Sequence, residues 1–309
     1  MRPSSILYFG GRALGAVFGP IPGWYMVLIE PFARRSTRVE AIATRSGTRM
    51  ALDLDEFVER KHYFRSYERR EIAFLHHHLH AGDTVIDVGA NVGVLALEAA
   101  TAVAPGGKII AIEPIAANVV RLNGNALLNR DIDIDIVQCA AGRSAGTILL
   151  GITAAQGSMR NSGSYSSSAE ESAVAVPVER LDHLVAQRCG IKTQIRLLKI
   201  DVEGMEPDVI MGASALFEAK RIDAVMFEWN SSVSSDSAAD SLRPYGFEIF
   251  ALGAWGRLRV APRASQRSLR ADRPTKHGLP ASIAAWCRGD GRLQTLVAIL
   301  PSPSRRFSR

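Results

Sequence analysis

The sequence predicts an α/β fold built on a mostly parallel sheet of seven strands, with helices on both faces. From Thr84 onward, short apolar runs alternate with segments of helical periodicity, which is the pattern of successive βαβ units. Runs of this kind are typical of parallel strands that helices cover on either side. A glycine-rich turn follows the first run directly, at the type of strand end where open α/β sheets bind ligands.

The individual elements follow from apolar periodicity and from the residues that end each segment. A helix opens at Tyr67, carries Ile72, Leu75 and Leu79 on one face, and stops at Ala81-Gly82. Further helices are expected around 94–100, at Ala116–Leu128 and from Leu181. The seven sheet strands are expected at Thr84–Val88, Lys108–Ile112, Ile132–Val137, Leu197–Val202, Asp223–Trp229, Phe247–Leu252 and Thr295–Leu300. The last two strands should form a hairpin at the sheet edge.

The chain divides into an extension, a main domain and a tail, which we place at residues 1–66, 67–302 and 303–309. In the extension, Val39–Thr44 and Arg49–Leu54 flank Ser46-Gly47 and predict a short hairpin. The main domain carries a hairpin insertion near residues 145–180, whose strands are joined by a long Ser-rich loop.

Composition narrows the class of protein. The three cysteines, Cys139, Cys189 and Cys287, are scattered and form no CxxC pair, which argues against a disulfide framework and a zinc site. A reducing, cytoplasmic location is therefore expected. The net charge of +6 draws on an arginine-rich stretch, Pro262 to His277, which we interpret as a solvated loop. Binding of an anionic substrate or lipid head group is the alternative for that stretch.

Residues 13–29 form an uncharged run that is too short and too interrupted for a membrane span. A span needs roughly 20 apolar residues, and Pro20, Pro22 and Gly23 break any helix near the middle of the run. We interpret the run as an N-terminal packing segment. Peripheral membrane contact through Trp24 and Tyr25 is the alternative.

The most informative segment is the turn Asp87-Val-Gly89-Ala-Asn91-Val-Gly93, which joins a buried strand to a helix. Gly89 lets the backbone approach a ligand, and Gly93 permits tight packing of the turn. A dinucleotide fingerprint, G-x-G-x-x-G, would place a glycine where Asp87 stands. A fixed negative charge is unfavourable beside a pyrophosphate and favourable beside the ammonium of S-adenosylmethionine, so the turn favours the methyl donor.

Glu113 ends the second strand, about 20 residues beyond the glycine turn. A carboxylate at this place can accept hydrogen bonds from both hydroxyls of a ribose. Together with the turn, Glu113 predicts a cofactor site at the carboxyl ends of the strands.

The order of these motifs resembles the FkbM family of S-adenosylmethionine-dependent methyltransferases. The resemblance rests on YERREIAFLHHHLHAGDTVIDVGANVG, GGKIIAIEP, LLN, VPVERLD and LLKIDVEGMEPDVIMGA, and it runs from about Tyr67 to Trp229. It implies a class I methyltransferase Rossmann-like fold, S-adenosylmethionine as cofactor, and O-methylation, typically of sugar or polyketide hydroxyls. The family pattern carries over to Asp87, Gly89, Asn91, Gly93 and Glu113 as cofactor residues, and it also includes Glu68.

Lys199, Asp201 and Glu203 are the candidate catalytic residues, because they stand at the end of the fourth strand, across from the expected donor. An alcohol is a weak nucleophile, so its methylation needs a base or a cation to manage the proton. Asp201 or Glu203 can serve as general base, with Lys199 setting the local charge. In the alternative interpretation, Asp201 only hydrogen-bonds the donor or a loop amide.

No metal is expected, although two clusters of side chains carry groups that can ligate a cation. Asp201, Glu228 and Asn230 offer oxygen ligands of the kind that hard divalent ions prefer. The His76–His78 run and His80 cannot converge on one ion, because neighbouring residues of a helix point in different directions. We interpret the histidines as an exposed helix surface.

The function expected from these residues is S-adenosylmethionine-dependent O-methylation of a sugar, glycan or polyketide-like small molecule. A nucleic-acid methyltransferase is one alternative, but base N-methylation usually goes with an Asn/Asp-Pro-Pro-aromatic tip, whereas this strand ends in Asp201-Val-Glu-Gly. A non-catalytic binding module that retains the fold is the other.

Overall fold

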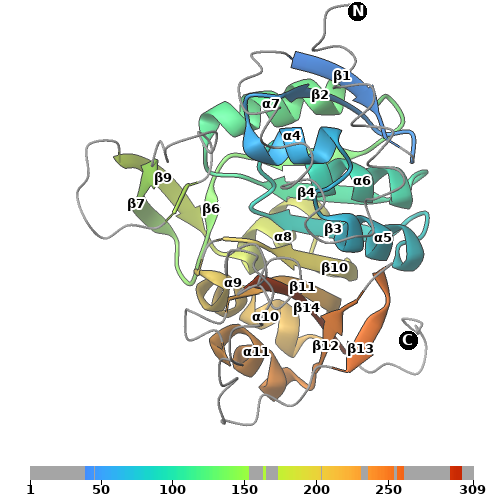
Figure 1. The fold of residues 1–309 in the computed structure, drawn as a ribbon. Coiled ribbons are helices and arrows are strands. Elements are labelled where there is room, and N and C mark those ends of the chain that lie inside the picture. Colours follow the sequence, from blue (N-terminus) through green and yellow to red (C-terminus); the bar gives the residue numbers. More distant parts are fainter. Residues whose placement is uncertain are drawn as a thin grey trace, which may run out of the picture.

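The sheet of the protein lies between two layers of helices, and a smaller sheet projects from one side of the body (Figure 1). This computed structural model describes residues 39–44, 46–152, 163–164, 173–202, 204–230, 236–253, 256–260 and 293–300. The main sheet has the strand order β13-β12-β14-β11-β10-β3-β4-β5. Its strands are β3 (Thr84–Val88), β4 (Lys108–Ile112), β5 (Ile134–Val137), β10 (Ile195–Ile200), β11 (Ile222–Asn230), β12 (Glu248–Leu252), β13 (Leu258–Val260) and β14 (Leu293–Ile299).

The seven predicted strands are all present, and the prediction of a mostly parallel α/β sheet is confirmed. Five neighbouring strands, from β5 through β11, pair in parallel, while β14 pairs antiparallel with both β11 and β12. The last two predicted strands therefore do form an antiparallel pair. The edge itself belongs to β13, which the sequence analysis did not predict and which pairs with β12.

The fourth strand, β10, ends earlier than predicted. Its parallel pairing with β3 stops at Ile200 opposite Val88, and Gly204 then turns the chain with a φ of 99°. Asp201 therefore follows the strand instead of forming part of it. The chain passes from β3 to β4 and β5 on one side and returns to β10 on the other. A switch point of this kind opens a crevice at the carboxyl ends of the strands.

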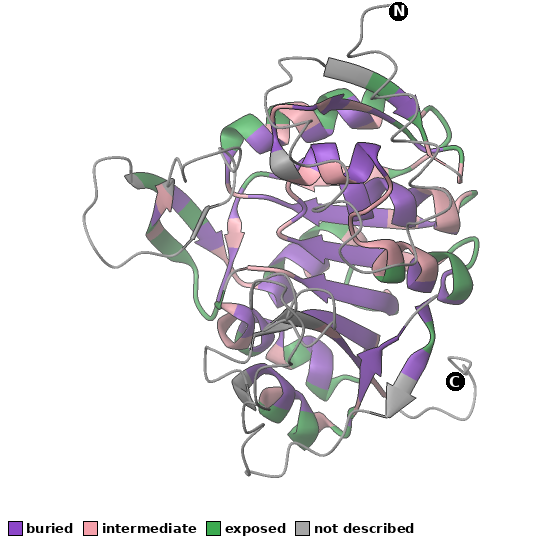
Figure 2. Cartoon of the chain, in the orientation of Figure 1, coloured by how far each residue is buried: buried purple, intermediate pink, exposed green. Residues whose placement is uncertain are grey.

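Alternate strand residues belong to two cores, one on each face of the sheet, and Figure 2 shows the central strands coloured as buried. On one face, Val85, Ile109 and Leu197 pack with the helices α5 (Arg69–His78) and α6 (Val94–Val103). On the other face, Ile86, Ile110 and Leu198 belong to a second core with four further helices. Those helices are α8 (Leu181–Cys189), α9 (Glu206–Gly212), α10 (Ser214–Glu218) and α11 (Asp236–Leu242). Every sheet residue of β10 is buried as a result.

Helix α5 starts two residues later than predicted, and the cause lies in the backbone. Glu68 has a φ of 43°, in the left-handed region, so it stands before the helix and cannot be its first turn. The helix also ends at His78, and His78 is buried at 4% exposure. The expected exposed histidine face is therefore wrong for His78, whose ring packs against Phe74 with centroids 4.4 Å apart.

The hairpin of β1 (Val39–Ala43) and β2 (Arg49–Asp53) packs on α7 (Ala116–Leu127) through side-chain amides. The carbonyl oxygen of the Asn125 side chain accepts from the Ala51 amide at 2.8 Å, and that of Asn129 accepts from the Arg49 amide at 2.8 Å. The following helix α4 (Phe57–Tyr63) continues this layer toward the site described below. The hairpin therefore covers the outer side of α7.

The hairpin turn is also tied to α6 by the buried Glu98, which is 1% exposed. Its Oε2 accepts from the Ser46 hydroxyl at 2.6 Å and contacts His76 Nε2 at 2.8 Å. Burial alone would raise the pKa of Glu98, but the hydrogen bonds from His76, Ser46 and Thr44 lower it below its usual value. The carboxylate is therefore stable as the charged form in the folded chain.

We expect Glu98→Ala to lower the free energy of unfolding by about 2 kcal/mol, because it leaves buried partners without an acceptor. Since the folded pKa of Glu98 is lowered, this contribution is present above the unfolded pKa and is lost as the pH falls through the folded pKa. Urea unfolding of wild type and variant across the acidic range measures both effects. An equal loss from Glu218→Ala, which removes an exposed carboxylate, would contradict this role.

The insertion forms a second sheet with the order β6-β9-β7-β8. Its main pair, β7 (Gly146–Ile152) and β9 (Ala173–Glu179), is an antiparallel hairpin, and β6 (Ala140–Ala141) and β8 (Gly163–Ser164) flank it. Figure 1 shows the hairpin standing away from the body. The Ser-rich loop between its strands lies mostly outside the described residues.

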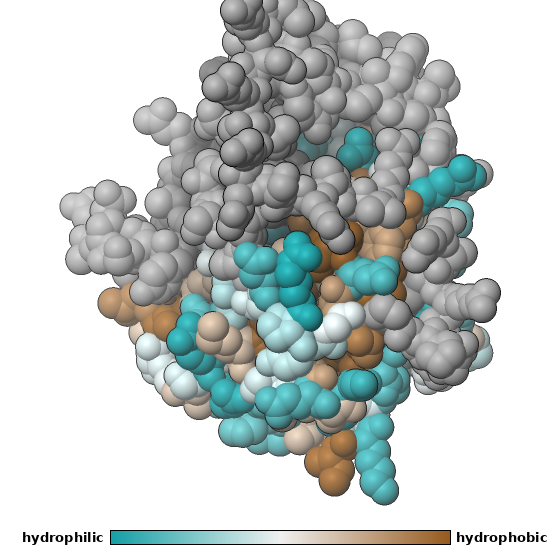
Figure 3. All heavy atoms as spheres, turned by 90° about the horizontal axis from the view of Figure 1, so that it is seen from below, coloured by the Kyte–Doolittle hydropathy of each residue, from teal (hydrophilic) through white to brown (hydrophobic). Residues whose placement is uncertain are grey.

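Surface features from the sequence analysis fall largely outside the described part of the chain, which includes neither residues 13–29 nor the arginine-rich stretch. Within that part, no helix has both the length and the apolar character needed to cross a bilayer. On the described residues of the face in Figure 3, hydrophilic and hydrophobic side chains are interspersed.

Candidate active site

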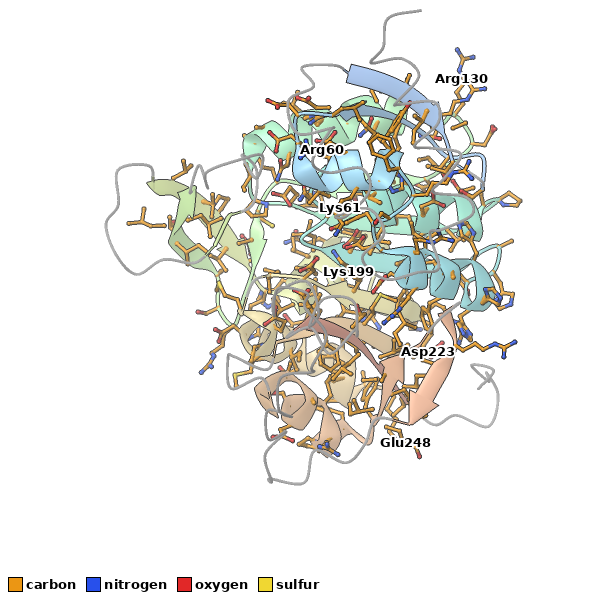
Figure 4. All side chains as sticks on the ribbon, in the orientation of Figure 1. Arg60, Lys61, Arg130, Lys199, Asp223 and Glu248 are labelled. Carbon is orange, nitrogen blue, oxygen red and sulfur yellow. The ribbon has the colours of Figure 1, made fainter. Side chains whose placement is uncertain are left out.

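A cavity of about 470 Å³ opens at the carboxyl ends of β3, β4, β10 and β11, next to the switch point of the sheet. It brings together six of the eight predicted site residues, namely Asp87, Gly89, Asn91, Glu113, Lys199 and Asp201. Gly93 lies outside its lining, and Glu203 lies outside the described residues. In Figure 4, Lys199 lies near the centre of the molecule, and Lys61 of α4 lies just above it in this view.

The glycine turn makes direct backbone contact with the tip of β10. Gly89 has a φ of 79°, and a Cβ atom at this position would lie 1.9 Å from the carbonyl oxygen of Asp201. The Asp201 amide also donates to the carbonyl of Val88 at 3.0 Å. Only glycine fits here, so the turn and the tip of β10 form one rigid wall of the cavity.

Gly93 lies at the end of the turn, close to α7. Its φ is 94°, and a Cβ atom there would lie 2.3 Å from Leu122 Cδ1 of α7. It immediately precedes α6. Gly93 therefore allows the turn to pack closely against α7, which is the packing role that the sequence predicted.

Glu113 accepts several hydrogen bonds at the end of β4, where it lines the cavity, and it is 4% exposed. Its Oε2 accepts from the Asn91 amide at 2.9 Å, while Oε1 accepts from the Ile115 amide at 3.0 Å and from Asn118 Nδ2 at 3.1 Å. Burial raises the pKa of Glu113 although these donors oppose the shift. The carboxylate thus joins the β3 turn to the end of β4. Asn118 was not predicted, because only the fold turns it back toward Glu113.

Asp87 and Lys199 form a buried ion pair on neighbouring strands. Lys199 Nζ lies 3.0 Å from Asp87 Oδ1 and 3.4 Å from Asp201 Oδ2, and it donates to the carbonyl of Gly89 at 3.1 Å. Burial alone would lower the pKa of Lys199, but the carboxylates of Asp87, Asp201 and Glu68 raise it above its usual value. Burial raises the pKa of Asp87, and Lys199 opposes that shift.

The start of α5 supplies a further wall that the sequence analysis described only in part. Tyr67, Glu68 and Glu71 line the cavity there, together with Lys199 and Asp201. Glu71 accepts a hydrogen bond from the hydroxyl of Thr295 on β14, which fixes its carboxylate. Glu71 and Thr295 were missed because they are more than 200 residues apart and no local motif connects them.

The described residues do not support a cation site. Although Asp201 and Glu228 both line the cavity, no group of three or more His, Cys, Asp or Glu side chains in the described part is placed to hold a metal ion. The side chain of Asn230 lies outside the described residues.

The residues present fit the methionine and ribose groups of S-adenosylmethionine. Asp87 lines the cavity and is 2% exposed, yet no described residue hydrogen-bonds its Oδ2, which leaves an unused acceptor for an ammonium. The backbone at Gly89 is open to close approach on the cavity side, and Glu113 is the acceptor nearest the end of β4. Asp87, Gly89, Asn91 and Glu113 are therefore the residues that would hold the donor.

Two features define a class I methyltransferase fold. One is the strand order, in which antiparallel β14 lies between β11 and β12. The other is the glycine turn with its two strand-end acids. Residues 87–249, more than half of the chain, match the methyltransferase FkbM domain. The chain belongs to the FkbM methyltransferase family.

Several solved structures are similar to this chain at low identity. They include the methyltransferase FkbM from Methylobacillus flagellatus, with 17% identity and a TM-score of 0.37 over 55% of this chain and 40% of that one. An S-adenosylmethionine-dependent O-methyltransferase from Thermotoga maritima has 14% identity and a TM-score of 0.39 over 87% and 79% of the two chains. A putative rRNA methylase from Clostridium thermocellum has 9% identity and a TM-score of 0.40 over 75% and 94%. A comparison with curated proteins finds no match.

Proposed function

We propose that the protein transfers the methyl group of S-adenosylmethionine to a hydroxyl of a neutral small molecule, such as a sugar, a glycan or a polyketide. The observation that carries this proposal is the unpaired Oδ2 of the buried Asp87, which shares one cavity with Glu113 and with the tip of β10. When bound, the donor supplies an electrophilic methyl carbon on a positively charged sulfur. The chain itself has to orient both reactants, exclude water and accept the hydroxyl proton.

The cofactor side of the cavity is assigned from its charges and its backbone. Asp87 would receive the ammonium, since Lys199 pairs with its Oδ1 while its buried Oδ2 has no hydrogen-bond partner among the described residues and favours a cation. Glu113 would accept hydrogen bonds from the ribose hydroxyls while it keeps the Asn91 amide in place. Gly89 would let the turn lie against the donor, and Gly93 supports that turn from behind.

The acceptor side is acidic, and this favours a neutral hydroxyl compound over nucleic acid. Glu68, Glu71, Asp201 and Glu228 line the cavity on this side, against the two cations Lys61 and Lys199. Nucleic acids are bound mainly through contacts of basic residues with phosphates, which this surface would repel. Carboxylates instead suit a polyol, because they accept hydrogen bonds from its hydroxyls.

We assign the acceptor hydroxyl to the tip of β10. Asp201 lies at that tip and lines the cavity, with a side chain that is 30% exposed, and Lys199 lies 3.4 Å from its Oδ2. Asp201 would orient the hydroxyl, and Lys199 would hold the Asp201 side chain in place. Glu203, two residues further on, stays a predicted catalytic residue.

The donor assignment is tested by calorimetric titration with S-adenosylhomocysteine. We expect Glu113→Ala to weaken binding about 100-fold, since it removes charged hydrogen bonds to the ribose and leaves the Asn91 amide unpaired. Glu218→Ala, which removes an exposed carboxylate far from the cavity, should bind as wild type does, and NAD should give no heat. Equal affinity of the Glu113 variant and wild type would contradict the assignment.

Transfer itself is tested with S-adenosylmethionine that is labelled in its methyl group. The acceptor panel pairs neutral mono- and oligosaccharides with RNA. Label in the saccharide supports the proposal, whereas label in RNA supports the nucleic-acid alternative. Donor binding without transfer to any member of a broad hydroxyl panel supports the non-catalytic alternative.

A further inference from the structure

Glu68 is held in an unusual place. It has a φ of 43°, where a residue with a side chain is strained by about 1 to 2 kcal/mol. Its carbonyl accepts from the Ile72 amide at 2.9 Å, but its side chain makes no capping hydrogen bond to α5. The side chain lines the cavity instead. Strain of this kind persists where the surroundings fix a functional group.

The surroundings of Glu68 contain more acids than one lysine can neutralise. Glu71 of α5, Asp87 of β3 and Asp201 after β10 share the cavity with Glu68 and Lys199. The other titratable groups that line it are Tyr67, Lys61 of α4, Glu113 after β4, Cys139 and Glu228 of β11. Several carboxylates so close together in a buried site do not all ionise. At least one of them keeps a proton in the empty cavity.

Glu68 is the carboxyl group best placed to keep that proton. Asp87 lies 3.0 Å from Lys199, and Asp201 lies 3.4 Å from it, so both have the cation beside them. Glu71 already accepts from Thr295. For Glu68, burial raises the pKa well above its usual value, and Glu71 and Asp201 raise it further, although Lys199 opposes them. Burial also raises the pKa of the neighbouring Tyr67, which stays protonated.

We propose that Glu68 holds a proton while the donor site is empty, releases it when the positively charged donor binds, and then receives the proton of the acceptor hydroxyl. This inference rests on the proposed function. In the transfer step, the acceptor oxygen bonds to the methyl carbon as the carbon–sulfur bond breaks and leaves its electron pair on sulfur. The hydroxyl proton passes to the Glu68 carboxylate, which restores the protonated state of the empty site.

The coupling follows from charge alone. The donor brings a positive sulfur and an ammonium into a cavity with an excess of carboxylates, and both favour the ionised form of Glu68. Transfer leaves a neutral sulfur, which no longer favours the ionised form of Glu68. Glu68 therefore takes up the hydroxyl proton. Glu68 is thereby a base only when the donor is present.

The test is a count of protons released on binding, obtained by calorimetry in buffers of different ionisation enthalpy. For wild type we expect about one proton released per S-adenosylmethionine near neutral pH, and distinctly fewer for S-adenosylhomocysteine, which lacks the positive sulfur. Glu68→Gln should bind S-adenosylmethionine but lose this release. Glu71→Gln, which changes a carboxyl group of the same cavity one helical turn away, should retain it.

Glu68→Asn provides a second variant, because asparagine tolerates the left-handed backbone and also lacks the titrating group. Proton release that persists in both Glu68 variants, or that is lost only in Glu71→Gln, overturns this inference while donor binding stands. Absence of heat with both ligands overturns the proposed function, and the inference with it. The proton count thus separates the two failures without an acceptor.

Discussion

Gly89→Ala is expected to lower the free energy of unfolding by about 3 to 4 kcal/mol and to abolish binding of S-adenosylhomocysteine. The added Cβ would lie 1.9 Å from the carbonyl oxygen of Asp201, and this oxygen belongs to the backbone and cannot rotate away. The turn would have to separate from the tip of β10. That movement breaks the wall of the cavity and disturbs the Lys199 contact with the carbonyl of Gly89.

The matched control for this substitution is Gly82→Ala. Gly82 has a φ of 85°, close to that of Gly89, but a Cβ atom there would meet nothing within 4 Å. Its replacement should therefore cost only the backbone strain, about 1 to 2 kcal/mol, and leave ligand binding intact. Chemical denaturation and calorimetry of both variants measure the difference. If the two variants lose the same stability, the close contact at Gly89 is not the cause.

The position of the glycine turn and of Glu113 in one cavity could be predicted because their determinants are local in the sequence. A strand, a turn with a fixed acid and two glycines, and a second strand-end acid specify where Asp87, Gly89 and Glu113 meet. The parallel sheet then has to place the ends of β3 and β4 side by side. Short apolar runs also gave the seven strands, since burial on both faces leaves little choice of residue.

The acceptor side could not be predicted to the same depth, because its contacts join distant parts of the chain. The left-handed backbone at Glu68 shortens α5, and nothing in the helical periodicity around Ile72 indicates that break. Thr295 reaches Glu71 only through the pairing of β14 with β11. The edge strand β13 is three residues long, which is too short to show a period.

The contact between Lys199 and Asp87 also joins distant parts of the chain, so the sequence alone does not show it. We expect the substitution of Lys199 to have the second large effect on stability. A lysine is unexpected in a strand whose six residues are all buried, unless a residue of opposite charge lies beside it. Asp87 supplies that partner from β3, where Lys199 and Asp87 occupy the same register. The sequence placed both residues in the site, but only the fold shows that they neutralise each other.

Lys199→Met should lower the free energy of unfolding by about 3 to 5 kcal/mol at neutral pH, because it keeps the aliphatic stem but leaves Asp87 buried without its cation. Burial already raises the pKa of Asp87, and loss of Lys199 removes the charge that opposes this shift. A group with a raised folded pKa loses stability as the pH rises through that pKa. The deficit of the variant should therefore shrink as the pH is lowered. Urea unfolding across the pH range measures it.

Two further variants test whether this result is specific to the ion pair. Lys108→Met removes a lysine whose ammonium only donates to the carbonyl of Arg188 near the surface, and it should change stability by no more than about 0.5 kcal/mol. The double variant Asp87→Asn/Lys199→Met replaces the ion pair with neutral groups and should recover most of the loss. If the double variant is as unstable as Lys199→Met alone, the cost arises from packing around Lys199. In that case Lys199 does not stabilise the carboxylate of Asp87, which the proposed donor site requires.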